Sequence, residues 1–304
     1  MNRKTLIGNS LLLLTAMIWG TAFVFQRQGM DSIEPISFNA ARMWLGAVII
    51  GALSLALRKR DLNIHNERSA EEQRSRDKST LAGGLLCGLF ISVASIAQQI
   101  GLVYTSAGKA GFITAMYMVL VPVFNLVLFR KSARPAVWAA VVIGVAGLYL
   151  LCATGGFNLS KGDTLVCICA VLFASHILCA DRYVPTGDPV AISAIQFAVA
   201  SVVCTIAAFI FEEPSWAKIA SAAIPILFCG ILSTCVGYTL QIVAQKMTDP
   251  TVASLILSLE SVFAAISGAL ILGERMTPRE TAGCVIMFAA IILVQIPLPH
   301  KKHY

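Results

Sequence analysis

Charged side chains are scarce in this chain of 304 residues. Asp, Glu, Lys and Arg make up 13% of it, whereas a soluble domain carries about 25%. Hydrophobic residues supply 57% of the chain, and the mean hydropathy is +0.79. So few charges exclude an ordinary soluble domain of this length.

Cysteines in loops, metal-ligand clusters and nucleotide-binding loops are also missing. All nine cysteines fall inside long apolar runs, where we interpret them as small packing residues. Cys167-x-Cys169 lacks companions at zinc-site spacing, so we predict no metal site. The sequence has no Walker A lysine loop, which argues against ATP-driven activity. We predict no cofactor.

Long apolar runs fill almost the whole chain. Each is close to the ~20 residues that a helix needs to cross a bilayer. The first run follows Arg3 and Lys4, but its apolar part is too long for a typical signal peptide, so we expect it to be retained. We predict an all-α integral membrane protein with ten transmembrane helices, over roughly 5–25, 36–57, 81–103, 110–129, 135–152, 162–180, 189–211, 219–243, 251–272 and 279–297.

The net charge of +7 reflects orientation in the membrane rather than a nucleic acid partner. With the N-terminus inside, sixteen Lys and Arg fall in cytoplasmic segments, six in external loops and one, Arg42, within a span. This bias follows the positive-inside rule and predicts that both termini are cytoplasmic. The 58–79 segment, rich in charges of both signs, is expected to be a solvated cytoplasmic loop.

The two halves of the chain resemble each other. The matched pairs are Trp19/Phe173 and Pro35/Pro189 at an offset of 154 residues, and Cys87/Cys229 and Gln99/Gln241 at an offset of 142. Because each half holds five predicted spans, an odd number, the second half must enter the membrane from the opposite face. We therefore predict two inverted five-helix repeats, residues 1–157 and 158–304, with a binding site between them near the midplane.

Three motifs resemble the EamA-like transporters of the drug/metabolite transporter superfamily. They are WGTAFVFQRQG from Trp19, PISFNAAR from Pro35 and LSLESVFAAISGALILGER from Leu257. The resemblance implies a ten-helix, inverted-repeat carrier of a bacterial inner membrane, often an exporter of small metabolites or drugs. It also implies a central cavity surrounded by helices 1–4 and 6–9. Ser261 departs from the family pattern, which often has proline after the helix-9 glutamate.

Two charged residues are expected inside spans, where a charge costs at least ~2.5–3.5 kcal/mol. Glu260 lies near the middle of its span. It either hydrogen-bonds to a neighbouring helix as a protonated acid or lines the transport path, where a titratable carboxyl group can couple transport to protons. Arg42 lies seven residues after Pro35. It either reaches the outer surface or anchors an anionic group, which is a substrate carboxylate or Glu260 itself.

Polar groups in the other spans complete the expected site. His176 is either a hydrogen-bonded packing residue or a proton relay. Aromatic and amide side chains are expected at the cavity from Trp19, Gln98, Gln99, Tyr117, Asn125, Tyr238 and Gln241. Such a lining suits a small amphiphilic organic molecule better than a bare ion.

We interpret the chain as a secondary transporter, not an enzyme, that exports a small organic metabolite or drug by alternating access, with proton antiport as a hypothesis. The alternatives are a uniporter or exchanger without proton coupling, a non-transporting membrane subunit, and a lipid-modifying membrane enzyme. That enzyme would need clustered Asp, His or Glu at one interface, and only Asp181 and Asp188 approach this. The expected partners are the substrate and the lipid bilayer; a homodimer is left open.

Overall fold

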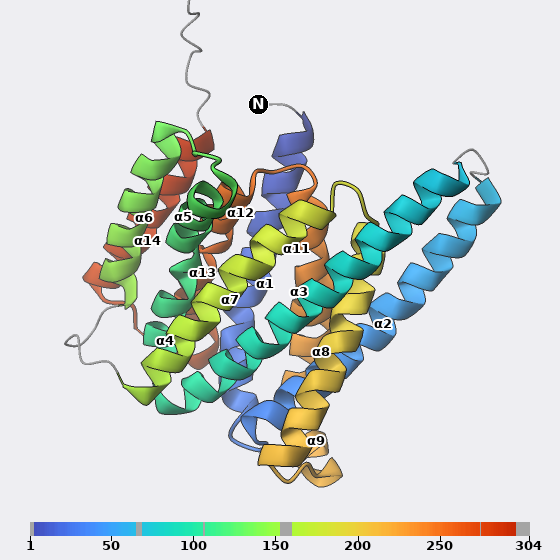
Figure 1. Cartoon of the computed structure of the whole chain (residues 1–304). Coiled ribbons are helices and arrows are strands. Elements are labelled where there is room, and N and C mark those ends of the chain that lie inside the picture. The colour runs from blue at the N-terminus through green and yellow to red at the C-terminus, as the bar shows by residue number, and fades with distance from the viewer. Residues whose placement is uncertain (1–2, 65–68, 106, 153–159, 274, 296–304) are drawn as a thin grey trace, which may run out of the picture.

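The chain is described by a computed structural model over residues 3–64, 69–105, 107–152, 160–273 and 275–295. Within these ranges it is helical and contains no strand (Figure 1). The helices of the first half are α1 (Arg3–Gly29), α2 (Pro35–Ile64), α3 (Ala70–Tyr104), α4 (Ala107–Ala115), α5 (Tyr117–Phe129) and α6 (Pro135–Cys152). Those of the second half are α7 (Lys161–Tyr183), α8 (Pro189–Phe211), α9 (Trp216–Ser221), α10 (Ala223–Leu227), the π-helix η1 (Phe228–Gly237), α11 (Tyr238–Gln245), α12 (Pro250–Leu257), α13 (Glu260–Leu272) and α14 (Pro278–Gln295).

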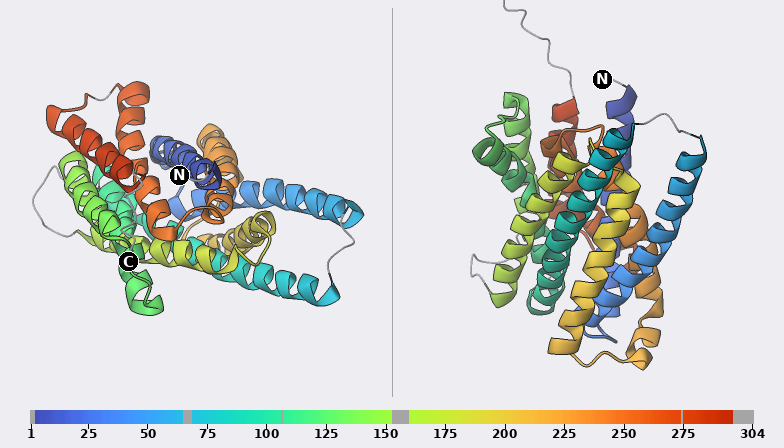
Figure 2. Two further views of the ribbon diagram at one scale, coloured as in Figure 1. Left: turned by 90° about the horizontal axis from the view of Figure 1, so that it is seen from above. Right: turned by 45° about the vertical axis from the view of Figure 1, so that its right-hand side comes forward.

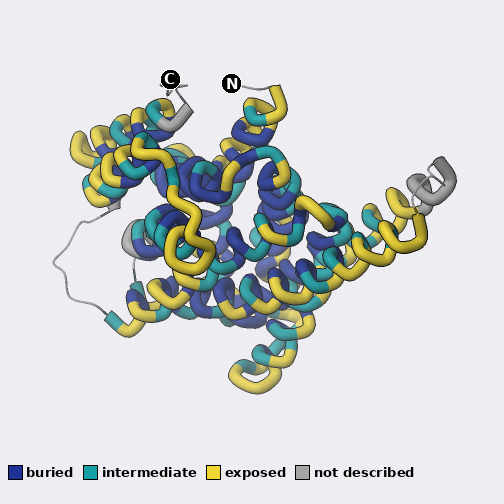
Figure 3. The backbone as a smooth tube through the Cα atoms, turned by 45° about the horizontal axis from the view of Figure 1, so that its top comes forward, coloured by how far each residue is buried: buried dark blue, intermediate teal, exposed yellow. Residues whose placement is uncertain are grey.

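Eight segments of the described chain are long and apolar enough to cross a membrane. They are Arg3–Gly29, Pro35–Arg58, Ala70–Tyr104, Ala110–Phe129, Lys161–Tyr183, Pro189–Phe211, Ala223–Gln245 and Pro250–Ile271. Exposed residues follow the outer sides of these helices, and buried residues gather toward the middle of the molecule (Figure 3). Large apolar side chains are among the exposed ones, as expected where the surroundings are lipid rather than water. The protein is therefore a multi-pass membrane protein.

Helix ends coincide with residues that satisfy free backbone groups. Asp188, directly before Pro189, accepts hydrogen bonds from the first free N–H groups of α8. Ser160 and Asp163 form a reciprocal capping box at the start of α7. Helix α13 ends at Leu272 and is capped by Gly273, whose φ of 70° lies in the left-handed region that favours glycine. Local sequence thus defines where these helices begin and end.

The 58–79 segment is largely helical, in contrast to the loop expected from its charges. Helix α2 continues to Ile64, α3 begins at Ala70, and the two extensions project beyond the rest of the molecule (Figure 2). Ser69 and Glu72 form a capping box at the start of α3. The many Arg, Lys, Glu and Gln residues that indicate exposure to water are also good helix formers, so charge alone could not predict a loop.

Two expected spans are interrupted near their middles. The helix of the 110–129 segment is broken at Met116, between α4 and α5. The helix of the 251–272 segment is broken at Ser258 and Leu259, between α12 and α13. Tight i→i−3 hydrogen bonds replace the regular helical pattern at both places. Apolarity alone gives no sign of such a break, because it predicts only the length of the span; Pro122, inside α5, is a helix-breaking residue near the first interruption.

Close packing brings the two halves together. Helix α3 packs on α7 and α8, α2 packs on α8, α1 packs on α13, and α6 packs on α14. Gly20 allows α1 to lie directly on the start of α13, because a Cβ atom there would be only 2.6 Å from the carbonyl oxygen of Glu260. The first turn of α13 is therefore held against α1.

Candidate functional site

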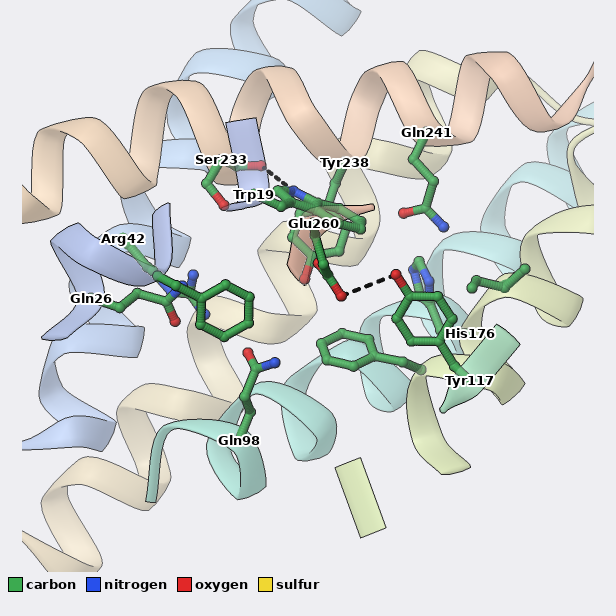
Figure 4. A pocket seen from close by; sticks show the side chains of 13 residues that line it. Trp19, Gln26, Arg42, Gln98, Tyr117, His176, Ser233, Tyr238, Gln241 and Glu260 are labelled. Atoms are coloured by element: carbon green, nitrogen blue, oxygen red, sulfur yellow. Dashed lines mark hydrogen bonds between the residues drawn. The ribbon is translucent and has the colours of Figure 1, made fainter. Parts of the chain in front are cut away.

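A small cavity lined by both polar and aromatic side chains lies between the two halves, beside the helix interruptions (Figure 4). All eight residues expected at the site line it: Trp19, Arg42, Gln98, Tyr117, His176, Tyr238, Gln241 and Glu260. Phe23, Gln26, Phe173, Ile177 and Ser233 complete the lining. The cavity volume is about 30 Å³, which is room for water and too little for an organic molecule. A larger ligand therefore requires the helices to move apart.

Glu260 is the first residue of α13, and its side chain is buried, with 4% of the residue exposed. The hydroxyl group of Tyr117 donates a hydrogen bond to Glu260 Oε1 at 3.0 Å. Tyr117 is itself the first residue of α5. Each interruption thus places its following residue at the cavity, and the bond joins the two halves of the chain. A hydroxyl donor can serve both an ionised and a protonated carboxyl group, so proton exchange need not break the contact.

Arg42 lies inside the protein rather than at its outer surface, with 2% of the residue exposed. Its Nε donates to Asn39 Oδ1 at 2.7 Å, and Asn39 Nδ2 donates to the carbonyl oxygen of Ser95 at 2.8 Å. Within the described ranges, no ion pair joins Arg42 to Glu260 or to another carboxylate. Asn39 therefore fixes one edge of the guanidinium group, and the group points into the cavity (Figure 4).

Two aromatic side chains, Trp19 and Tyr238, form one wall of the cavity that the two charged residues also line. The rings of Trp19 and Tyr238 are 4.4 Å apart at their centroids, with an interplanar angle of 50°. Trp19 Nε1 donates to the carbonyl oxygen of Ser233 at 3.3 Å. That oxygen belongs to η1, a π-helix of the kind that often occurs at functional sites. A Cβ atom at Gly237 would be 2.6 Å from Trp19 Nε1, so this position requires glycine for the close approach.

Amide groups give the cavity further hydrogen-bonding capacity. His176 Nε2 and Gln196 Oε1 are 3.0 Å apart, which accounts for His176 as a hydrogen-bonded packing residue that also lines the cavity. Gln98 Nε2 donates to a threonine hydroxyl at 3.3 Å. Within the described chain, Gln26 Oε1 and Gln241 Oε1 are buried and accept no protein hydrogen bond. Buried acceptors of this kind are normally satisfied by water or ligand.

Some lining residues were not predicted from the sequence. Trp19, Phe23 and Gln26 are separated by four and three residues, so helical spacing alone could have placed them on one face. Conversely, Gln99 and Asn125 were expected at the cavity and do not line it. Polarity identified them as unusual within a span, but it could not say which way each side chain points.

Comparison with known protein families identifies the family to which this chain belongs. The model of the EamA-like transporter family matches residues 6–153 and, a second time, residues 160–296. The chain belongs to the EamA-like transporter family. This family consists of membrane transporters, so the alternatives of a lipid-modifying enzyme and a non-transporting subunit do not hold.

Relatives of this transporter are found in archaea and bacteria. It is 26% identical over 294 residues to an uncharacterised transporter of Archaeoglobus fulgidus, a match that covers 96% of this chain and 87% of that protein. It is 24% identical over 307 residues to the uncharacterised transporter YwfM of Bacillus subtilis, which covers 97% and 96%. It is also 29% identical over 165 residues to the threonine/homoserine exporter RhtA of Escherichia coli, but this match covers only 53% and 55%. One solved crystal structure has the same fold, with a TM-score of 0.75, 17% identity and 96% coverage of both chains.

Proposed function

We propose that this transporter is a secondary carrier that exports a small organic metabolite or drug across the bacterial inner membrane by alternating access. The observation that carries the proposal is the cavity itself. It holds one titratable carboxyl group, one guanidinium group and an aromatic wall, all buried between the two halves of the chain. Proton antiport through Glu260 is part of the proposal; a uniporter or exchanger without proton coupling is the alternative.

We further propose ten membrane-crossing helices in two inverted repeats, residues 1–157 and 158–304, with α6 and α14 as the fifth and tenth. The repeat boundary lies outside the described residues. Two observations support the repeats. Trp19 and its counterpart Phe173 both line the cavity, as do Phe23 and Ile177 at the same offset. The packing of α3 on α8 is also matched by the packing of α2 on η1, which is the relation that exchange of the two halves requires.

The substrate we propose is amphiphilic, with a carboxylate at one end. The planar guanidinium group of Arg42 can hold a carboxylate through two parallel hydrogen bonds. Trp19 and Tyr238 would contact the apolar body, and Glu260 would face the opposite, polar or cationic end. An amino acid has this arrangement, and the relative RhtA is named as a threonine/homoserine exporter. We therefore place zwitterionic amino acids first among the substrates to test.

Transport requires the contracted cavity to open alternately to the two sides of the membrane. When the cavity opens to water, the carboxyl group of Glu260 can release or take up a proton. When it closes, burial disfavours the charged form unless substrate or Arg42 compensates it. Proton and substrate would thus occupy the cavity in turn, which gives antiport. The lipid bilayer and the substrate are the partners in this scheme; a homodimer stays open, and no nucleic acid has a role.

Inside-out membrane vesicles test the proposed direction and coupling. We expect vesicles containing this transporter to accumulate a radiolabelled amino acid faster than vesicles without it, and an acidic lumen to increase the rate. Uptake should be competed by other zwitterionic amino acids and less by amines that lack a carboxylate. If no member of an amino acid and metabolite panel accumulates above the empty vesicles, the carrier function proposed here is wrong.

Reporter fusions test the proposed orientation. Helix α1 begins and α14 ends at the same end of the molecule (Figure 1), as an even number of crossings requires. With the positive-inside bias, both termini are expected to be cytoplasmic. A C-terminal green fluorescent protein should therefore fluoresce, while an alkaline phosphatase fused at the same place should remain inactive. An active phosphatase would show that the orientation is reversed.

A further inference from the structure

Two ion pairs join the halves of the chain at opposite ends of the molecule. Arg76 of α3 pairs with Asp188, just before α8. Lys218 of α9 pairs with Glu34, just before α2. The connection between α7 and α8 lies at the end where α1 begins, and α9 lies at the other end (Figure 1). Each pair therefore connects one half of the chain to the other, on a different side of the membrane.

The two pairs are related by the same offsets as the sequence repeat. Glu34 and Asp188 are 154 residues apart, and each directly precedes the proline that starts a helix. Arg76 and Lys218 are 142 residues apart. Each acid is thus the counterpart of the other acid, and each base of the other base. Two unrelated surface ion pairs would not be expected to follow both offsets of the repeat.

In the pair Arg76–Asp188, called the inner pair from here on, neighbouring groups hold Asp188 in place. One carboxylate oxygen caps the start of α8, while the other accepts the hydrogen bond from Arg76. The backbone N–H of Asp188 donates to the hydroxyl group of Thr80, which lies one helical turn after Arg76 on α3. Removal of the arginine side chain therefore leaves α8 capped, so its effect can be measured without unfolding the helix end.

The pair Glu34–Lys218, called the outer pair from here on, is reinforced by a second carboxylate. Glu212, at the end of α8, accepts hydrogen bonds from the backbone N–H groups of Ile36 and Ser37 at 2.8 and 2.7 Å. These are free N–H groups of the first turn of α2, where a negative charge is also favoured by the helix dipole. Beside it, Lys218 binds Glu34. The outer end is thus held by two contacts between the halves.

We propose that the two ion pairs are symmetry-related latches of the transport cycle. The pair Glu34–Lys218 closes the outer side, the pair Arg76–Asp188 closes the cytoplasmic side, and both are closed around the contracted cavity of this structure. This inference rests on the proposed carrier function and orientation. In each half of the cycle one latch opens while the other holds, so that the cavity never opens to both sides.

The outer latch is not a pH sensor in the neutral range. The hydrogen bond from Lys218 lowers the pKa of Glu34 below its ordinary value of 4.5, although partial burial opposes this. The same bond raises the pKa of Lys218, with smaller contributions from the charges of Glu212 and Glu213. The pair therefore stays ionised at neutral and mildly acidic pH and is lost as the pH falls through the lowered pKa of Glu34. Opening must be driven by events at the cavity instead.

Thiol labelling of the cavity tests the latches directly. Ser233→Cys places a reporter in the cavity lining, and a membrane-impermeant charged thiol reagent can reach it only through water. Lys218→Gln should increase its labelling rate in right-side-out vesicles, and Arg76→Gln should do so in inside-out vesicles. We expect a two- to fivefold increase in each case, the size that loss of a partly exposed ion pair produces. The same variants with Ser233 intact correct for labelling of native cysteines.

Two control variants separate latch opening from general loosening. Lys218→Arg keeps the ion pair and should label like the parent protein. Arg58→Gln removes the ion pair with Asp77, which joins α2 to α3 within one half, and should leave both rates unchanged. The latch proposal is wrong if Lys218→Gln and Arg76→Gln raise labelling from the same side, or from neither. Labelling needs no transported substrate, so the two proposals can fail separately. Side-specific labelling without uptake of any substrate would reject the carrier function, but it would still show that each ion pair controls access to the cavity from one side.

Discussion

Glu260→Gln should abolish the response of transport to an imposed pH gradient while substrate exchange continues, with weaker binding of a substrate whose cationic end faces this position. Glutamine retains the size of the side chain and can still accept the hydrogen bond from the hydroxyl group of Tyr117, so the fold and the cavity should survive. Glutamine cannot take up or release a proton, so proton movement down the pH gradient is no longer coupled to substrate transport. The measurement is uptake into vesicles with and without a pH difference, beside exchange of labelled for unlabelled substrate.

Two further variants make the Glu260 experiment specific. Glu71 is exposed in the first turn of α3, so Glu71→Gln removes a carboxylate of the same type far from the cavity and should leave coupling intact. Tyr117→Phe removes the hydrogen bond but keeps the titratable group, so we expect coupling to persist with an altered pH profile. Wild-type pH dependence in Glu260→Gln would show that Glu260 serves only to hold the helices together.

Arg42→Ala should eliminate transport, and Arg42→Lys should weaken substrate binding without unfolding the protein. Lysine keeps the positive charge but lacks the planar fork that matches a carboxylate and the Nε that Asn39 binds. Hydrogen bonds to charged groups are worth ~1.5–3 kcal/mol, so loss of one such contact corresponds to an increase in KM of about 10- to 100-fold. The KM and maximal rate of uptake are measured for both variants.

The matched control for Arg42 is another arginine of the same helix. Arg58 is exposed and lies outside the cavity, so Arg58→Ala should transport with unchanged KM. The role in substrate binding also predicts selectivity. Compared with the wild-type protein, Arg42→Lys should bind a carboxylate substrate less well. It should bind an analogue in which an amide replaces that carboxylate about as well as the wild-type protein does. Normal transport by Arg42→Ala would mean that Arg42 serves packing alone.

Most of the architecture was predictable because lipid imposes simple rules on sequence. A span must be apolar over a fixed length, so eight of the expected helices coincide with segments that can cross a membrane. Charged or amide groups within a span are costly and therefore conspicuous, which is why Glu260, Arg42 and Gln241 could be singled out. The family resemblance of three motifs led to a membership that the family model confirms along the chain.

By itself, the sequence determined the membrane class, the family and which polar side chains lie within the spans. The family follows from the resemblance of three motifs. The membrane class and the polar side chains follow from local composition, since the cost of a buried charge and the length of an apolar run depend on nearby residues alone. Only the tertiary structure decided where those side chains point. It broke the helices at Met116 and before Glu260, formed the π-helix beside Trp19, and directed Arg42 inward. Two of these features depend on contacts between residues distant in sequence, as between Trp19 and Ser233 or between Asn39 and Ser95, and such contacts leave no local pattern that reports them.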